Sequence, residues 1–391
     1  MSELKRISTS RAFYIVIAAV AFLYIPLALN YTWPLFFPGA PRLQDGLNTL
    51  INGSAYAVGE GSVEAVRHGD YSQHRTVMAV HTTLGAIALG LAMFQFSARL
   101  RARYPAVHRW MGRAYLAFMS VSMLTAIIFL VAAPYVGHFI GRAFDLQLWS
   151  LALGTLGSAW YALYAIRNRD MTTHRAWMTY SIALMMTAPL LRVLWIGIQP
   201  IVPQHDLLTN LGASAIVLGV MAPYGAAAAF VMTQPSRPNS SVPSCSAAVY
   251  ALIAGLALLG SIGYTTLAWA LPEYIPRSLT AYHVVPLWIA MAISLAGAWR
   301  ARPRGNTVRE QRWRWLAWGV AAAPVAACVT VVVSAPVYSA SDAVIAGGMV
   351  GAPGPITIAF ALMVHSAARR IPGATARRTD APAALAASVS E

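Results

Sequence analysis

Histidines in the first half of the 391-residue chain are the side chains best suited to chemistry, because neutral imidazoles ligate metal ions and haem iron. His108 and His174 stand two or three residues before long apolar runs, in the similar segments HRWMGR and HRAWMT. His81 lies about six residues into an earlier apolar run, and His138 stands just before another. What these four residues can do depends on the elements that hold them.

The composition identifies those elements as membrane helices. Hydrophobic residues make up 58% of the chain and charged residues 10%, and the mean hydropathy is +0.57. In a soluble protein about a quarter of the residues are charged, so the composition excludes a soluble protein. Apolar runs of about twenty residues fit helical spans and not the alternating segments of a membrane barrel. The predicted fold is therefore an all-α, polytopic membrane helix bundle in contact with the lipid bilayer.

About ten transmembrane helices are predicted, which places both termini on one side of the membrane. Most lysines and arginines fall in the tails and in the loops on that side, and cytoplasmic loops carry such an excess. We therefore expect both termini in the cytoplasm and the protein in the bacterial inner membrane. The net charge of +15 then reflects orientation, and no nucleic-acid partner is expected. The predicted spans are residues 12–30, 75–96, 110–132, 146–166, 177–199, 207–232, 247–270, 280–299, 315–334 and 345–366.

A Pro/Ser-rich segment at 234–245 divides the chain into two predicted parts. Residues 1–233 form a six-helix bundle with most of the histidines, and residues 247–368 form a four-helix bundle. Residues 369–391, rich in Ala, Arg and Ser, are expected to be a disordered cytoplasmic tail. The longest outer connection, about 31–74, could form a small cap over the bundle.

The predicted topology places the four histidines in two pairs. His108 and His174 lie near the inner surface, whereas His81, roughly 10 Å deep, and His138 lie on the outer side. Haem with two histidine ligands needs one imidazole on each face of its ring, from neighbouring helices at one depth. The spacing therefore predicts an inner haem b pair, His108 with His174, and an outer pair, His81 with His138. His74 could compete for the role of His138.

Small and basic residues beside the histidines have two interpretations each. Gly85 and Gly112 stand one turn from His81 and His108, where they could leave room for a porphyrin or let two helices pack closely. Arg109 and Arg175 directly follow the inner histidines, so they could hold haem propionates or simply orient the helices and bind anionic lipid.

Arg192 lies inside the fifth predicted span, where an unpaired guanidinium costs several kcal/mol. It could bind an anionic substrate group, an outer haem propionate or a quinone carbonyl. It could equally pair with a backbone carbonyl or with Asp145.

Together these residues resemble a known family. The pattern is His81-x-x-x-Gly85, Gln95-Phe96, Leu100-Arg101, His108-Arg109, Gly112-Arg113, Tyr115, His174-Arg175, Trp177-Met178 and Arg192. Over about residues 74–200 it resembles the bacterial predicted membrane proteins called domain of unknown function 2306. That family has no established activity, so the resemblance implies a fold. The alternation of histidines is also similar in pattern to the cytochrome b-561 type, which implies one haem at each membrane face.

These observations predict a haem b electron-transfer protein or oxidoreductase module. The chain lacks a P-loop and a Rossmann unit, so its electron donor would be a quinol, a small soluble reductant or a partner protein. Whether the chain is an enzyme stays open. One alternative is a transporter or lipid carrier, because Pro353 and Pro355 in AGGMVGAPGP would break the last span. Another is a non-catalytic scaffold. The remaining histidines, His68, His205, His283 and His365, are expected to be structural.

Overall fold

Every element of the protein is a helix in the part of the chain that the structure describes. The structure is a computed structural model, and it describes residues 2–60, 62–133, 142–200, 207–235, 242, 245–271 and 277–368. The predicted tail at 369–391, His138 and His205 lie outside these ranges. The longer helices are α1 (Ser2–Tyr31), α5 (Arg75–Gln95), α7 (Pro105–Ala132), α8 (Arg142–Arg167), α9 (Met171–Met185), α10 (Thr187–Ile198), α11 (Leu207–Thr233), α12 (Ala247–Ala270), α13 (Arg277–Ala301), α14 (Thr307–Ser334), α15 (Ala340–Val350) and α16 (Pro353–Ala368).

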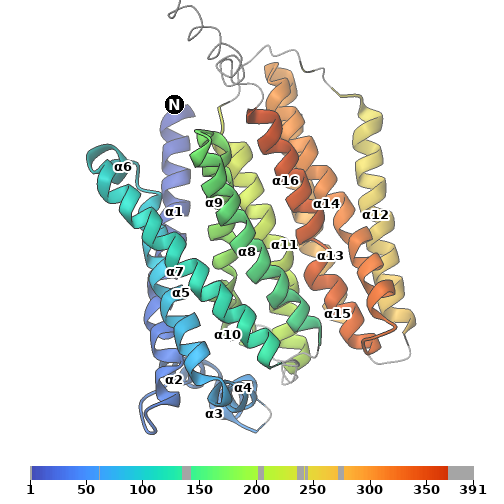
Figure 1. The fold of residues 1–391 in the computed structure, drawn as a ribbon. Helices are drawn as coiled ribbons and strands as arrows, with labels where there is room; N and C mark the ends of the chain where they lie inside the picture. The colour runs from blue at the N-terminus through green and yellow to red at the C-terminus, as the bar shows by residue number, and fades with distance from the viewer. Residues whose placement is uncertain are drawn as a thin grey trace, which may run out of the picture.

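The helices form an upright bundle (Figure 1). Nine spans in the described ranges are long and apolar enough to cross a membrane, with α9 and α10 forming one and α15 and α16 another. The 26-residue helix α8 runs beside them as a further long helix. The predicted all-α polytopic bundle is therefore confirmed.

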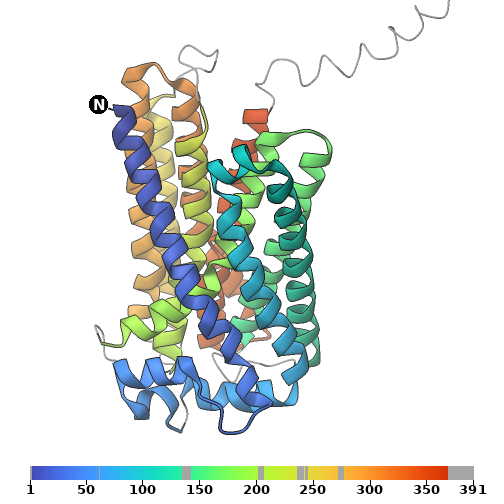
Figure 2. The ribbon, with the colours of Figure 1, turned by 90° about the vertical axis from the view of Figure 1, so that its left-hand side faces the viewer.

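The two ends of the bundle differ in character. One end, here called the basic end, holds the start of α1, the end of α16 and the arginine-rich helix α6 (Ala98–Arg103) (Figures 1 and 2). The opposite cap end holds the short helices α2 (Leu43–Asn52), α3 (Ser54–Val58) and α4 (Val63–Gln73). The predicted small cap over the bundle is thus present. The start of α1 and the end of α16 lie at the same end, as a bundle of ten spans requires.

An aspartate cap and a proline mark where the two HR-containing helices begin. Asp170 caps α9, because its Oδ1 accepts from the backbone N–H of Thr173 at 2.9 Å. Helix α7 begins at Pro105, whose missing N–H costs nothing at a helix start. His108 and His174 are consequently both the fourth residue of a helix, and each backbone N–H bonds back to its cap residue.

Helices α5, α7, α8 and α9 form a four-helix group. Helix α5 packs on α7, α7 on α8, α8 on α9, and α9 makes a lighter contact with α5. This order places α7 opposite α9 and α5 opposite α8. The core between them is built from small and flexible side chains, and α1 covers α5 from outside. The arrangement brings the two HR-containing helices to facing positions.

Helix α11 joins this group to the remaining helices. It contacts α9 and α10 on one side and α13, α14, α15 and α16 on the other. Two hydrophobic cores draw residues from both predicted parts of the chain. The parts 1–233 and 247–368 therefore pack together through α11 and through the contacts of α8 with α15 and of α9 with α16, and their independence as domains stays a prediction.

Two of the spans are interrupted within the bundle. Helix α9 ends at Met185 and α10 begins at Thr187, two residues before Pro189. Helix α15 ends at Val350 and α16 begins at Pro353, as the glycines and prolines of this segment predict. Such breaks free backbone groups inside the bundle that other parts of the protein must satisfy.

Gly219 provides a test of how closely α11 and α15 pack. A Cβ at this position would lie 2.3 Å from the carbonyl oxygen of Met349, a backbone atom that cannot step aside. We expect Gly219→Ala to lower the free energy of unfolding by about 1–3 kcal/mol, because the two helices must separate. The measurement is thermal unfolding of the purified protein in detergent.

Gly225, on the same helix, is the matched control. A Cβ there meets nothing within 4 Å, so Gly225→Ala should leave stability unchanged or raise it slightly. Equal melting temperatures for the two variants would contradict the close approach of α11 and α15.

Candidate functional site

His108 and His174 meet the first requirement of a shared ligand site. They occupy matching positions in the first turns of α7 and α9, which face each other across the four-helix group. Both side chains are half-buried at the basic end. They are close enough to interact electrostatically. Both residues of the sequence-predicted inner pair therefore lie at one end of the bundle, and their role as joint ligands stays a prediction.

Two of the predicted histidines have a fixed tautomer. His174 Nδ1 lies 3.0 Å from the carbonyl oxygen of Ala162, and His81 Nδ1 lies 2.8 Å from that of Ser122. A carbonyl can only accept, so the proton must be on Nδ1 and the lone pair on Nε2. Histidines that ligate metal commonly donate their other ring N–H in this way. His81 and His174 are thus prepared to bind a metal through Nε2.

His108 differs from these two. Its Nδ1 is buried and has no hydrogen-bond partner in the described structure. A buried ring nitrogen without a partner is costly, and such atoms call for a ligand, an ion or a water molecule. Of the two inner histidines, His174 is oriented by the protein and His108 keeps an unsatisfied nitrogen.

A layer of packed side chains lies deeper in the four-helix group. Tyr115, seven residues along α7 from His108, is fully buried. Its hydroxyl donates to Met185 Sδ on the facing helix at 3.3 Å, and Met119 below it is also fully buried. Tyr115 therefore ties α7 to α9 about 10 Å below His108. A flat group between the histidines would lie between this layer and the basic end.

Basic and polar side chains surround the pair. Arg101 and Arg109 lie within electrostatic range of His108, as does Arg175 of His174. Arg109 and Arg175 are exposed, so their guanidinium groups can reach an anionic group at this end. Gln95 donates through Nε2 to the carbonyl of His108 at 3.3 Å, which links the end of α5 to the start of α7.

Gly85 and Gly112 lie where α5 crosses α7. A Cβ on Gly85 would stand 3.0 Å from Ser122 Oγ, and one on Gly112 would stand 3.5 Å from Gln95 Oε1. Ser122 Oγ itself donates to the carbonyl of His81 at 2.8 Å. Gly85 therefore lies in a tight contact between the two helices, whereas Gly112 has room for a Cβ, and a role of either glycine beside a porphyrin stays a prediction.

The outer pair is described only in part. His81 lies in α5 with its ring against Ser122 of α7, while its predicted partner His138 falls outside the described residues. His74, the other candidate, ends α4 and packs its ring edge-on against Phe129 with centroids 5.6 Å apart. An outer haem pair stays a prediction.

Arg192 of α10 lies between the bundle and the cap. Its guanidinium carbon is 5.9 Å from the centre of the Tyr31 ring, and it is within electrostatic range of His81. Its Nε is buried without a hydrogen-bond partner in the described structure. Asp145, a partner considered from the sequence, is within electrostatic range of Tyr338, two residues before α15. The buried Nε remains available to an acceptor.

The cap contains a polar cluster that sequence reasoning missed. His68 Nε2 lies 3.6 Å from Asp45 Oδ2 and 3.7 Å from Glu64 Oε2. Tyr31 and Gln44 donate to the two oxygens of the fully buried Glu64 at 2.9 and 2.7 Å. The only signal was the i, i+4 spacing of Glu64 and His68, because Asp45 comes from another helix. The cluster ties α1, α2 and α4 together.

The comparison with protein families agrees with the resemblance seen in the sequence. Residues 78–223 match a family described as predicted membrane protein, DUF2306. The matched segment runs from α5 into α11 and includes the whole four-helix group with His81, His108 and His174. No curated protein and no solved structure matches the chain. The likeness to cytochromes b-561 remains one of pattern.

The cap cluster can be tested at Tyr31. Tyr31→Phe removes one donor from a buried carboxyl group while keeping the ring, so we expect a loss of about 1–3 kcal/mol in unfolding free energy. Thermal unfolding in detergent measures it. Tyr14→Phe is the comparison on the same helix, since Tyr14 donates to the neutral carbonyl of Met93 at 2.8 Å; its loss should be smaller, about 0.5–1.5 kcal/mol. A larger loss for Tyr14→Phe would show that Glu64 does not depend on Tyr31.

Proposed function

We propose that the protein is a haem b-binding electron-transfer module of the bacterial inner membrane, with its basic end towards the cytoplasm. The observation that carries the proposal is the matched position of His108 and His174 in the first turns of two facing helices. Diagonal helices of a four-helix group can present two imidazoles to opposite faces of one flat ring. The excess of arginine at this end supports the orientation.

The residues present suit such a group. His174 would bind iron through Nε2, which its bond to Ala162 leaves free, and His108 would supply the second ligand. Arg109 and Arg175 would hold the propionates, because guanidinium groups form strong bidentate bonds with carboxylates. Haem supplies one-electron chemistry at a potential that the axial ligands and their surroundings tune. A quinol or a small soluble reductant would deliver the electron.

An absorbance spectrum tests the proposal. Protein purified from haem-replete cells should show a Soret band and the sharp reduced bands of six-coordinate haem b. His174→Ala should remove the inner haem, because His108 cannot hold the iron alone. The variant then loses all of its haem if the protein binds one haem, and at least half if it binds two. Pyridine haemochrome absorbance per protein gives the stoichiometry.

His365 offers a control histidine, because it is exposed near the end of α16. His365→Ala should keep the spectrum and the haem content of the parent protein. A colourless preparation of the folded parent would overturn the proposal, and so would full haem content in both His174→Ala and His108→Ala.

A second candidate function, carriage of a small molecule, is supported by the two interrupted spans. Discontinuous helices near the middle of the membrane are typical of transporter binding sites. The break between α9 and α10 and the break between α15 and α16 contribute Leu184, Thr187, Met349, Val350 and Pro353 to one cavity. That cavity is separate from the histidine pair, so a haem protein could contain it as well.

A further inference from the structure

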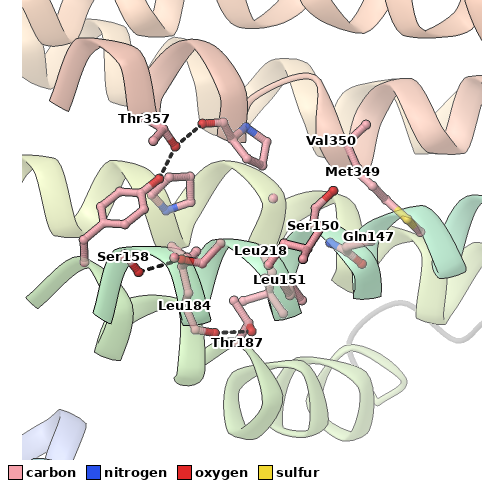
Figure 3. Close-up of a pocket in the computed structure, with 18 of the residues that line it drawn as sticks. Gln147, Ser150, Leu151, Ser158, Leu184, Thr187, Leu218, Met349, Val350 and Thr357 are labelled. Atoms are coloured by element: carbon pink, nitrogen blue, oxygen red, sulfur yellow. Dashed lines mark hydrogen bonds between the residues drawn. The ribbon is translucent and has the colours of Figure 1, made fainter. Parts of the chain in front are cut away.

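A cavity lies where the four-helix group meets the second half of the chain. It has a volume of about 240 Å³ and is lined by α8, α9, α10, α11, α15 and α16 (Figure 3). A water molecule occupies roughly 30 Å³ of liquid, so the space would hold about eight waters or a ring-sized organic group. It lies between the two interrupted spans.

The lining carries no formal charge. No aspartate, glutamate, lysine, arginine or histidine is among the described residues that line the cavity. An ion inside the membrane needs a counter-charge or many polar contacts. The N-terminus of α16 does not supply one for an anion, because Pro353 and Pro355 lack the N–H groups that a helix start normally offers. The occupant is therefore neutral.

The hydroxyl groups of the lining face the cavity as acceptors. Ser150 donates to the carbonyl of Leu146 at 2.8 Å, and Ser158 donates to that of Gly154 at 2.6 Å. Thr187 donates in the same way to Leu184. Each hydroxyl has one proton, so only its oxygen lone pairs are left for a ligand.

The hydroxyl protons of Tyr180 and Thr357, at the interface between α9 and α16, are also used in bonds within the protein. Thr357 Oγ1 donates to the carbonyl of Pro353, so Tyr180 must be the donor in the short bond between the two hydroxyls (Figure 3). Tyr180 is left with acceptor lone pairs at the cavity. A ligand that only accepts could bond these hydroxyls only by breaking one of their bonds. It would depend instead on the second N–H of Gln147 and the indole N–H of Trp177, which lie elsewhere in the described lining.

The cavity opens towards the lipid side of α8. Leu153 lines it and is 55% exposed, and Gly157, one turn further along, is also exposed. A Cβ on Gly157 would meet nothing within 4 Å. Because exposed residues in the middle of a spanning helix face acyl chains, the occupant can enter from the membrane.

From these features we propose that the cavity binds a neutral, largely apolar alcohol or phenol, whose hydroxyl donates to a hydroxyl oxygen of the lining, with Tyr180 as the principal acceptor. A membrane quinol and an aliphatic lipid alcohol share this chemistry. The proposal names the class of molecule that the second candidate function would carry. Its carrier role rests on that function. The binding site itself does not require haem.

The test compares a donor with its methyl ether. We would titrate 4-butylphenol and 4-butylanisole into the full-length protein in lipid nanodiscs and measure binding by calorimetry. The two differ in one donated hydrogen bond, so the phenol should bind about 5–10-fold more tightly. A second titration compares a short-chain benzoquinol with 1-decanol. Tighter binding of the quinol indicates a membrane quinol as the natural ligand, and tighter binding of decanol indicates an aliphatic lipid alcohol.

Two variants locate the binding. Gly157→Leu should fill the opening and weaken phenol binding at least about tenfold, whereas Gly225→Leu, also exposed and without a Cβ neighbour, should leave it unchanged. Tyr180→Phe keeps the ring stacked on Phe360 and removes the acceptor, so it should reduce the preference for phenol over anisole without weakening anisole. Thermal unfolding checks that each variant is folded.

These outcomes test the binding site separately from the carrier function. Equal affinities for phenol and anisole would overturn the donor requirement, and an absence of binding, or binding that Gly157→Leu leaves intact, would overturn the site. Binding without movement of the phenol across a vesicle membrane would keep the site and exclude the carrier function. The haem proposal depends on none of these results, because its test is the spectrum of the protein.

Discussion

The requirement that every backbone polar group find a partner away from water shapes this protein. Within lipid the α-helix satisfies that requirement by itself, which is why every regular element of the described chain is a helix. Hydroxyl side chains in the spans obey the same constraint, since many donate to the carbonyl four residues earlier, as Ser261 and Ser294 do. One consequence is that hydroxyl oxygens inside the bundle are acceptors wherever they face a hollow.

The interrupted spans show what happens when the helix cannot satisfy its own backbone. Pro353 and Pro355 remove the donors that would bond the carbonyls of Met349 and Gly351. Side chains of neighbouring helices bond other carbonyls of the same segment: Tyr264 donates to the carbonyl of Val344 at 2.9 Å, and His283 Nδ1 bonds that of Gly348 at 3.0 Å. His283 is fully buried, so the sequence-based expectation of a structural role has a physical basis. Side chains of α12 and α13 thus bind the segment that leads into the break.

Much of the fold could be predicted from the sequence because hydropathy and length decide it. The span boundaries follow from apolar runs of about twenty residues, and the break at Gly351 follows from adjacent glycine and prolines. The first-turn positions of His108 and His174 could be anticipated from the repeated HR segments. These are local properties of the chain, readable in windows of a few residues.

The features that the sequence could not reveal depend on contacts between distant segments. Asp45 meets His68 only because the cap folds back, and Tyr180 meets Thr357 only because α9 lies beside α16. Gly85 illustrates the same limit, since Ser122, which an added Cβ would meet at 3.0 Å, is on another helix. The hollow between the two halves arises from the packing of six helices and has no signature in any one of them.

The lateral opening beside Leu153 and Gly157 has a consequence for how occupancy is controlled. A compound that reaches the protein through the acyl chains is governed by its mole fraction in the bilayer, not by its concentration in the buffer. Partitioning therefore concentrates apolar alcohols next to the opening before any protein contact forms. An affinity expressed per volume of water would shift with the lipid-to-protein ratio, whereas one expressed per lipid molecule would stay constant.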